Sequence, residues 1–201
     1  MNRVGKHEGG KASKEAVASP LTPAMERIED AAFLDPVADW LGPAVRPVVS
    51  STQVRDFLRG RWLGHALHPL LTDLPLGAWL CTSLLDMFGD RRSRPVAEGL
   101  LAFGVAAAVP TALSGAAEWT ATAGRERRVG TLHAGTNAIA LGLYSASLLA
   151  RLRGRQALGA GLGVAGGLTA IAGGYLGGHL TLSRKVGTRD PAFLDDRPAD
   201  A

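Results

Sequence analysis

Four long apolar runs fill most of the chain from residue 62 to residue 182, and short polar loops separate them. They cover residues 62–88, 96–119, 129–150 and 157–182. Each run is close to the ~20 residues that a helix needs to cross hydrocarbon. None shows the polar stripe that a helix of a soluble bundle carries. The pattern therefore predicts an all-α membrane protein built on an antiparallel four-helix transmembrane bundle.

The segments that flank these runs are more polar. Residues 1–24 lack an apolar centre and are typical of a disordered tail, and residues 183–201 form a second polar tail. Residues 25–61 mix apolar and acidic positions and contain Pro36, Pro43 and Pro47. We expect two or three amphipathic helices there, broken at the prolines, on the membrane surface or against the bundle. A flexible linker is the alternative interpretation.

Composition agrees with helices that pack closely in lipid. Aromatic residues make up 5% of the chain, whereas glycine occurs 26 times. Gly159, Gly163 and Gly167 recur every fourth residue, which favours close helix contacts and allows a homo-oligomer through small-residue faces. The single cysteine, Cys81, excludes an internal disulfide and any iron–sulfur cluster held by this chain alone.

The net charge is +4, and arginines are concentrated in the loops between the runs. This distribution indicates membrane-flanking segments and not a nucleic-acid surface. Four spans place both termini on one side of the membrane. Cations near span ends are more numerous on that side (Arg55, Arg59, Arg61, Arg125, Arg127, Arg128, Arg184, Lys185, Arg189) than on the other (Arg91, Arg92, Arg94, Arg151, Arg153, Arg155). The bias favours cytoplasmic termini.

Four of the five histidines lie at span ends that share one membrane face. His65 and His68 begin the first run, His133 begins the third, and His179 is near the end of the fourth. Histidine is uncommon in lipid and normally faces the bundle or water. Pro69 leaves two versions open, one with both His65 and His68 in the helix and one with a turn above it. We expect the four imidazoles to form one shallow layer.

Such a layer has the chemistry of a cofactor site. His68 or His65, together with His133 or His179, would supply the axial ligands of a b-type haem between facing helices. Three or four of these imidazoles would instead bind a transition metal ion. The alternative without chemistry is that each imidazole only hydrogen-bonds a backbone carbonyl.

Three further polar residues lie within the runs and are candidates for a proton path or for supporting the histidines. A carboxylate in lipid is costly, so Asp73 is expected to be protonated, or bonded to Asn137, or bonded to Thr72 and nearby backbone. Asn137 follows His133 by one turn, and Tyr175 precedes His179 by one turn. These positions predict contacts with the imidazoles.

The stretch "GRWLGHALHPLLTDLPLGAWLCTSLLD" resembles the opening of the DUF2231 family, bacterial four-span membrane proteins of unknown function. "RRVGTLHAGTNAIALGLY" and "AGGYLGGHL" resemble its third and fourth spans, so the resemblance covers residues 54–186. It implies a place in the bacterial inner membrane and makes His65, His68, Asp73, His133 and His179 the motif positions. Some relatives resemble fusions to a Rieske iron–sulfur domain, which implies electron transfer.

This chain has no Cys-x-His pair after Val186, so a redox partner would be a separate protein or a quinone. The leading hypothesis is therefore a haem- or metal-binding membrane protein with an electron-transfer role. A non-redox anchoring or assembly subunit is the first alternative, and proton or small-solute transport through Asp73 is the second. The sequence contains no nucleophile elbow, phosphate loop or cysteine pair, so we assign no catalytic residue.

Overall fold

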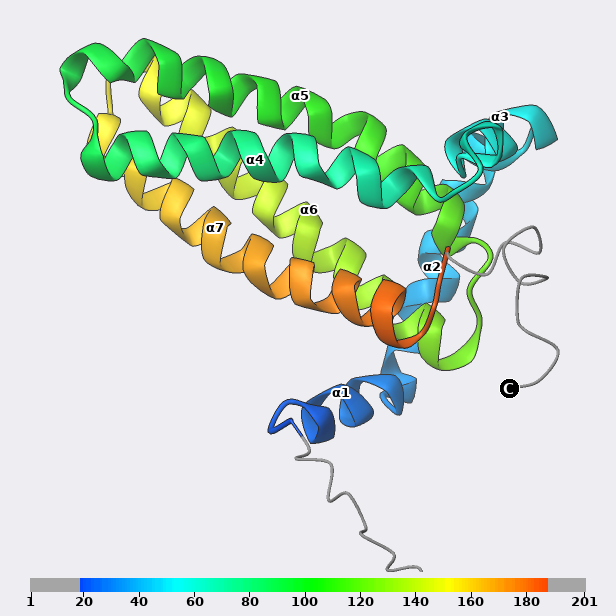
Figure 1. The fold of residues 1–201 in the computed structure, drawn as a ribbon. Helices are drawn as coiled ribbons and strands as arrows, with labels where there is room; N and C mark the ends of the chain where they lie inside the picture. Colours follow the sequence, from blue (N-terminus) through cyan, green and yellow to red (C-terminus); the bar gives the residue numbers. More distant parts are fainter. Residues whose placement is uncertain (1–18, 188–201) are drawn as a thin grey trace, which may run out of the picture.

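The computed structural model describes residues 19–187, and all regular secondary structure in that range is helical. Four long helices dominate it (Figure 1): α4 (Leu67–Phe88), α5 (Arg94–Trp119), α6 (Gly124–Leu152) and α7 (Gln156–Gly178). A short 3-10 helix, η4 (Arg91–Ser93), precedes α5, and a π-helix, η5 (His179–Ser183), continues α7. Each long helix runs antiparallel to its neighbours in the chain.

The first apolar run begins its helix later than expected. Gly60 and Gly64 adopt left-handed backbone angles, φ 76° and φ 81°, on either side of the 3-10 helix η3 (Arg61–Leu63). Helix α4 therefore starts at Leu67, and His65 lies before it. Pro69 falls in the first turn, where a backbone N–H has no helical acceptor anyway. The structure thus has the turn above the helix, with His68 inside the helix and His65 outside.

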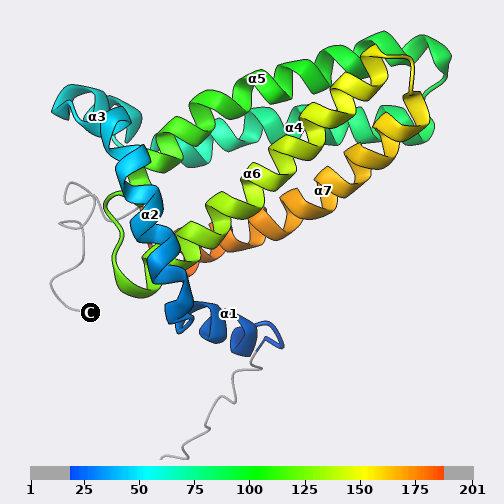
Figure 2. The ribbon, with the colours of Figure 1, turned by 180° about the vertical axis from the view of Figure 1, so that it is seen from behind.

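The long helices form two hairpins, α4–α5 and α6–α7. The hairpins lie close together at the end that holds η4 and the α6–α7 link, and they diverge toward the other end (Figures 1 and 2). Trp79, Leu101, Ala108, Tyr144 and Ala170 form the buried core between them. The narrow end is therefore packed, and the wide end is the one that carries the histidines.

An ion pair joins the hairpins at the narrow end. Arg151 is 3% exposed, and its guanidinium donates to both carboxylate oxygens of Asp86 at 2.8 and 2.5 Å. Arg91 and Arg92 are much nearer to Asp86 in the sequence, yet the cation that binds it comes from the other hairpin. Asp86 ends its helix facing the other hairpin, whereas Arg91 and Arg92 belong to η4 in the loop.

Three short helices, α1 (Thr22–Glu29), α2 (Asp35–Val45) and α3 (Thr52–Leu58), lie across the wide end (Figure 1). Two 3-10 helices, η1 (Ala32–Leu34) and η2 (Arg46–Val49), connect them. We call residues 22–58 the collar. Pro36 is in the first turn of α2, but Pro43 lies inside α2 and does not end it, so the break expected there is absent.

Acidic residues of the collar pair with the arginines at the start of α6. Arg128 donates to both carboxylate oxygens of Asp35 at 2.8 and 2.7 Å. Arg125 pairs with Asp30 at 2.7 Å and Arg127 with Asp39 at 3.2 Å. The hydrogen bonds from Arg128 hold the pKa of Asp35 below its ordinary value. These ion pairs, together with the packing of Met25 and Ile28 against Val129 and Leu176, dock the collar on the bundle.

Two of the described helical segments are long and apolar enough to cross a membrane, Arg91–Trp119 and Gln156–Ser183. They contain α5 and α7, one helix from each hairpin.

Candidate functional site

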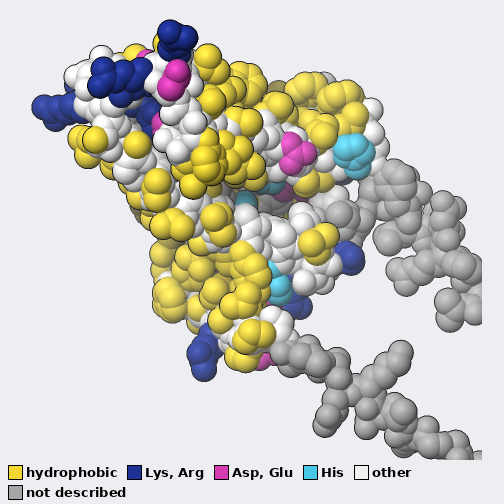
Figure 3. Space-filling view, turned by 60° about the vertical axis from the view of Figure 1, so that its left-hand side comes forward, with side chains coloured by type: hydrophobic (Ala, Val, Ile, Leu, Met, Phe, Trp, Pro, Cys, Tyr) yellow, Lys and Arg dark blue, Asp and Glu magenta, His cyan; other side chains and the backbone are white. Residues whose placement is uncertain are grey.

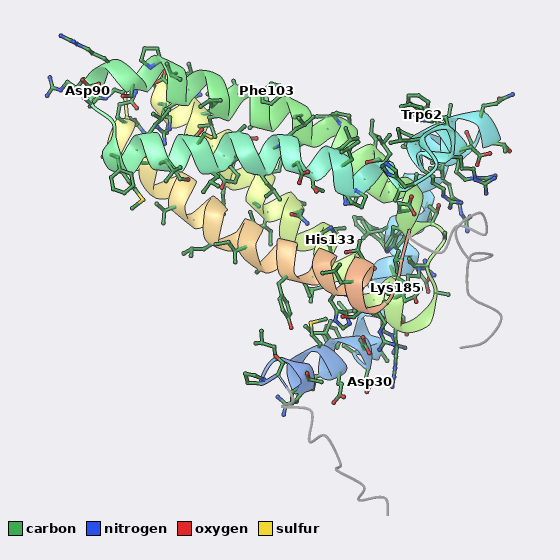
Figure 4. The ribbon with its side chains drawn as sticks, in the orientation of Figure 1. Asp30, Trp62, Asp90, Phe103, His133 and Lys185 are labelled. Atoms are coloured by element: carbon green, nitrogen blue, oxygen red, sulfur yellow. The ribbon has the colours of Figure 1, made fainter. Side chains whose placement is uncertain are left out.

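The wide end brings two imidazoles together across the hairpins. The rings of His68 on α4 and His133 on α6 lie 6.0 Å apart between centroids, with an interplanar angle of 89°. Both side chains are partly buried. Figure 4 labels His133. Residues that are far apart in the sequence thus meet between the two hairpins.

Each imidazole is oriented by a carbonyl of its own hairpin. Nδ1 of His68 lies 2.9 Å from the carbonyl oxygen of Thr111, and Nδ1 of His133 lies 2.9 Å from that of Gly173. A carbonyl oxygen only accepts a hydrogen bond, so Nδ1 carries the proton in both rings. Nε2 of both rings therefore keeps a lone pair, which is the tautomer that a metal ligand needs. In His133 this lone pair faces the side-chain amide of Asn137, whose Nδ2 lies 3.3 Å from Nε2.

Glycines make room for both rings. A Cβ at Gly115 would lie 2.7 Å from Cε1 of His68, and a Cβ at Gly177 would lie 2.8 Å from Cε1 of His133. Both spacings are too short for a side chain. The backbones of α5 and α7 thus approach the imidazole edges because these positions have no side chain.

Asn137 supports its own histidine and does not contact Asp73. Its Nδ2 donates to the carbonyl of His133 at 2.9 Å and lies 3.2 Å from Nδ1 of that ring. Asp73 is exposed on α4, and no hydrogen bond or ion pair of its side chain is found within residues 19–187. Thr72 donates to the carbonyl of Pro69 at 2.6 Å. Both bonds that the sequence suggested for the carboxylate are thus absent.

His65 and His179 lie apart from this pair. His65 is exposed beside the carbonyl of Ala66 and lines a pocket of about 270 Å³ with Arg59, Glu118 and Lys185. His179 pairs with Glu29, and Tyr175 is 44% exposed on α7. Over the described range, no three His, Cys, Asp or Glu side chains are placed to hold one metal ion. The four imidazoles therefore do not form a single layer.

The surface is hollowed between the hairpins at the wide end. Figure 3 shows histidine and acidic side chains within this hollow, while hydrophobic side chains cover much of the surface on either side. Polar side chains thus reach the surface between two apolar regions.

Glu29 is a buried acid that sequence reasoning missed. It is 2% exposed; its Oε1 lies 2.7 Å from Nε2 of His179, and both oxygens accept hydrogen bonds from Arg184. Burial raises the pKa of Glu29, but the hydrogen bonds from Arg184 and His179 outweigh it and hold the pKa below its ordinary value. Nothing near Glu29 in the sequence indicated that this carboxylate is buried and paired, because its partners lie 150 or more residues later.

The lowered pKa of Glu29 predicts that the collar loosens in acid. A carboxylate with a depressed folded pKa stabilises the fold above its unfolded pKa, and this contribution is lost as pH falls through the folded value. Glu29→Gln should weaken charge-assisted hydrogen bonds of about 1.5–3 kcal/mol each and raise cleavage in the collar by at least about tenfold at neutral pH. Limited proteolysis across the pH range measures both effects. Glu26→Gln, an exposed neighbour, is the control, and equal cleavage of the two variants would contradict the assignment.

Comparison with known proteins agrees with this architecture. A family model described as "Predicted membrane protein (DUF2231)" matches residues 64–190, which includes all four long helices. No curated protein and no solved structure matches the chain. The match covers more than half of the sequence, and the chain therefore belongs to the DUF2231 family of predicted membrane proteins.

Proposed function

We propose that this protein crosses the membrane four times and binds a b-type haem between His68 and His133. The four spans are supported by the side chains that the bundle leaves exposed. Large apolar residues face outward on every long helix: Leu70 and Leu80 on α4, Phe103 and Val109 on α5, Ile139 and Leu149 on α6, Leu168 and Ile171 on α7. A soluble bundle would place polar residues on these faces, whereas lipid favours apolar ones.

The observation that carries the haem proposal is the pair of neighbouring imidazoles on α4 and α6 whose Nε2 atoms carry no proton. A ligand at Nε2 of His133 would displace the contact with Nδ2 of Asn137. The ring centroids of His68 and His133 lie 6.0 Å apart, so these two residues would hold the haem iron. Two ligands are too few for a mononuclear zinc or copper site, which takes three or four. Two axial histidines are enough for a haem iron.

Such a site suits electron transfer. A haem with two imidazole ligands supplies one-electron chemistry and leaves no open axial position for a substrate. The chain contributes the orientation of both rings through Thr111 and Gly173 and the apolar walls of the bundle. We infer a quinone or a separate redox protein as the electron partner, with the protein in the bacterial inner membrane and both termini in the cytoplasm.

The visible spectrum and metal content of the full chain purified in detergent test this proposal. We expect a Soret band, a pyridine haemochrome of b type and about one iron per chain. A preparation from haem-replete cells that shows neither a Soret band nor stoichiometric metal would overturn the proposal. That outcome would favour an anchoring or assembly subunit, in which the histidines only hydrogen-bond the backbone.

A glycine on α7 provides a second prediction about the same site. Gly177→Ala should displace the imidazole of His133, because the new Cβ would lie 2.8 Å from the ring, and we expect at least a tenfold loss of haem occupancy. Gly174→Ala is the matched control on the same helix, since nothing lies within 4 Å of its Cβ. Haem titration of both variants measures the effect, and equal occupancy would argue against ligation by His133.

A further inference from the structure

The contacts between the two hairpins join equivalent positions. His68 faces His133, Trp79 stacks on Tyr144 with centroids 4.1 Å apart, and Asp86 pairs with Arg151. The two members of each pair are 65 residues apart in the sequence. Side chains of α4 and α6 thus contact each other at three pairs of equivalent positions.

The contacts inside each hairpin match in the same way. His68 bonds the carbonyl of Thr111, and His133 bonds that of Gly173. Thr82 donates to the carbonyl of Ala97 at 3.3 Å, and Ser147 donates to that of Gly159 at 2.6 Å. Glycines lie against the same partners in both hairpins, Gly104 and Gly166 against the aromatic rings, Gly115 and Gly177 against the imidazoles. All of these acceptor and glycine positions on α5 and α7 are 62 residues apart.

Pairs of equivalent residues meet only along a two-fold axis. In a two-fold interface a residue contacts its own counterpart where the axis passes, and other residues contact non-equivalent ones. Three such pairs lie along α4 from His68 to Asp86, a length of roughly 27 Å at 1.5 Å per residue. The axis therefore runs along the bundle between α4 and α6.

We infer that α4–α5 and α6–α7 are repeats of one helical hairpin, and that the site between His68 and His133 is a symmetric site on the axis of the repeat. Its ligand is a group that takes the same nitrogen atom from each repeat, as an iron with two equivalent axial positions does. The ligand part of this inference rests on the proposed function, whereas the repeat rests on the contacts alone.

The repeat also distinguishes the residues that pair across the axis from the other candidate site residues. Gly130 is the counterpart of His65, Ala138 that of Asp73, and Leu180 that of Glu118. At the position of Asp73 the second hairpin is helical without a polar side chain, so the helix does not require that carboxylate. At the position of His65 the hairpins differ, because α6 is helical there and α4 has not yet begun. His65, Asp73 and Glu118 lie outside the symmetric site.

Exchanging the stacked aromatic residues tests the repeat without any ligand. Trp79→Tyr combined with Tyr144→Trp places each ring over the glycine of the other repeat, Gly104 or Gly166. We expect the doubly exchanged protein to keep an unfolding midpoint in denaturant near that of the parent. The Trp79→Ala, Tyr144→Ala double variant is the reference for a lost contact. An exchanged protein as unstable as this reference would overturn the repeat.

Substituting the ligands one at a time tests the symmetric site. His68→Met and His133→Met should both retain haem, with the same Soret position and the same direction of shift in reduction potential, because a thioether replaces an equivalent imidazole in each. Haem loss in one variant and retention in the other would overturn the symmetric site while leaving the proposed function standing. A parent protein without haem would contradict both the proposed function and the inference that the symmetric site binds iron. The aromatic exchange would still test the repeat.

Discussion

Replacing His68 with alanine is expected to abolish the Soret band of the purified protein, and His133→Ala is expected to do the same. Each substitution removes one of the two proposed nitrogen ligands, whose ring centroids lie 6.0 Å apart. The loss of affinity should exceed the roughly 10–100-fold that follows removal of an outer partner of a ligand. Optical titration with haem in detergent measures it.

The other histidines are the controls for this experiment. His65→Ala and His179→Ala should keep the Soret band, because His65 lies outside α4 and His179 is bonded to Glu29. Circular dichroism on each variant shows that the helices remain. A band that disappears with His179 or His65, and survives without His68, would contradict ligation by the pair on the axis.

Arg151→Met is expected to destabilise the bundle by about 1.5–3 kcal/mol, the usual effect of losing a hydrogen bond to a charged group. Arg151 is 3% exposed and is the residue that joins the second hairpin to Asp86. Its loss leaves the Asp86 carboxylate facing the narrow end of the bundle with no cation in contact. Unfolding in detergent by increasing denaturant, followed by circular dichroism, measures the change.

Two variants show whether the effect comes from the pair. Asp86→Asn added to Arg151→Met removes the uncompensated charge, so most of the stability should return. Arg153→Met, at an exposed position just after α6, should change stability by less than about 0.5 kcal/mol. If Arg151→Met were as mild as Arg153→Met, the ion pair would not hold the hairpins together.

The inferred repeat leaves little trace in the sequence. The letters "HPLLTDLPLGAW" and "HAGTNAIALGLY" agree at their first position and at a leucine and a glycine near the end. So few identities in apolar helices give no signal by themselves, because leucine, alanine and glycine recur in any such segment. The shared contacts of His68 with His133 and of Trp79 with Tyr144 made the correspondence visible.

The sequence by itself determined which segments form the long helices and where most of them begin and end. Hydrophobicity and length depend only on consecutive residues, so the runs at 96–119 and 157–182 closely match α5 and α7 with η5. It also determined that histidines lie near one end of the helices, and the family match agrees with the resemblance found in the motifs. The late start of α4 depended on the left-handed turns at Gly60 and Gly64, which the apolar pattern does not report.

Only the tertiary structure decided which of these residues meet. The pairing of His68 with His133, of Asp86 with Arg151, and of Glu29 with His179 and Arg184 depends on how the hairpins cross and where the collar docks. Such contacts join residues that are 65 or more positions apart, and a small rotation of one helix would exchange their partners. The sequence therefore places histidines at one level, and the packing of the two hairpins selects the pair.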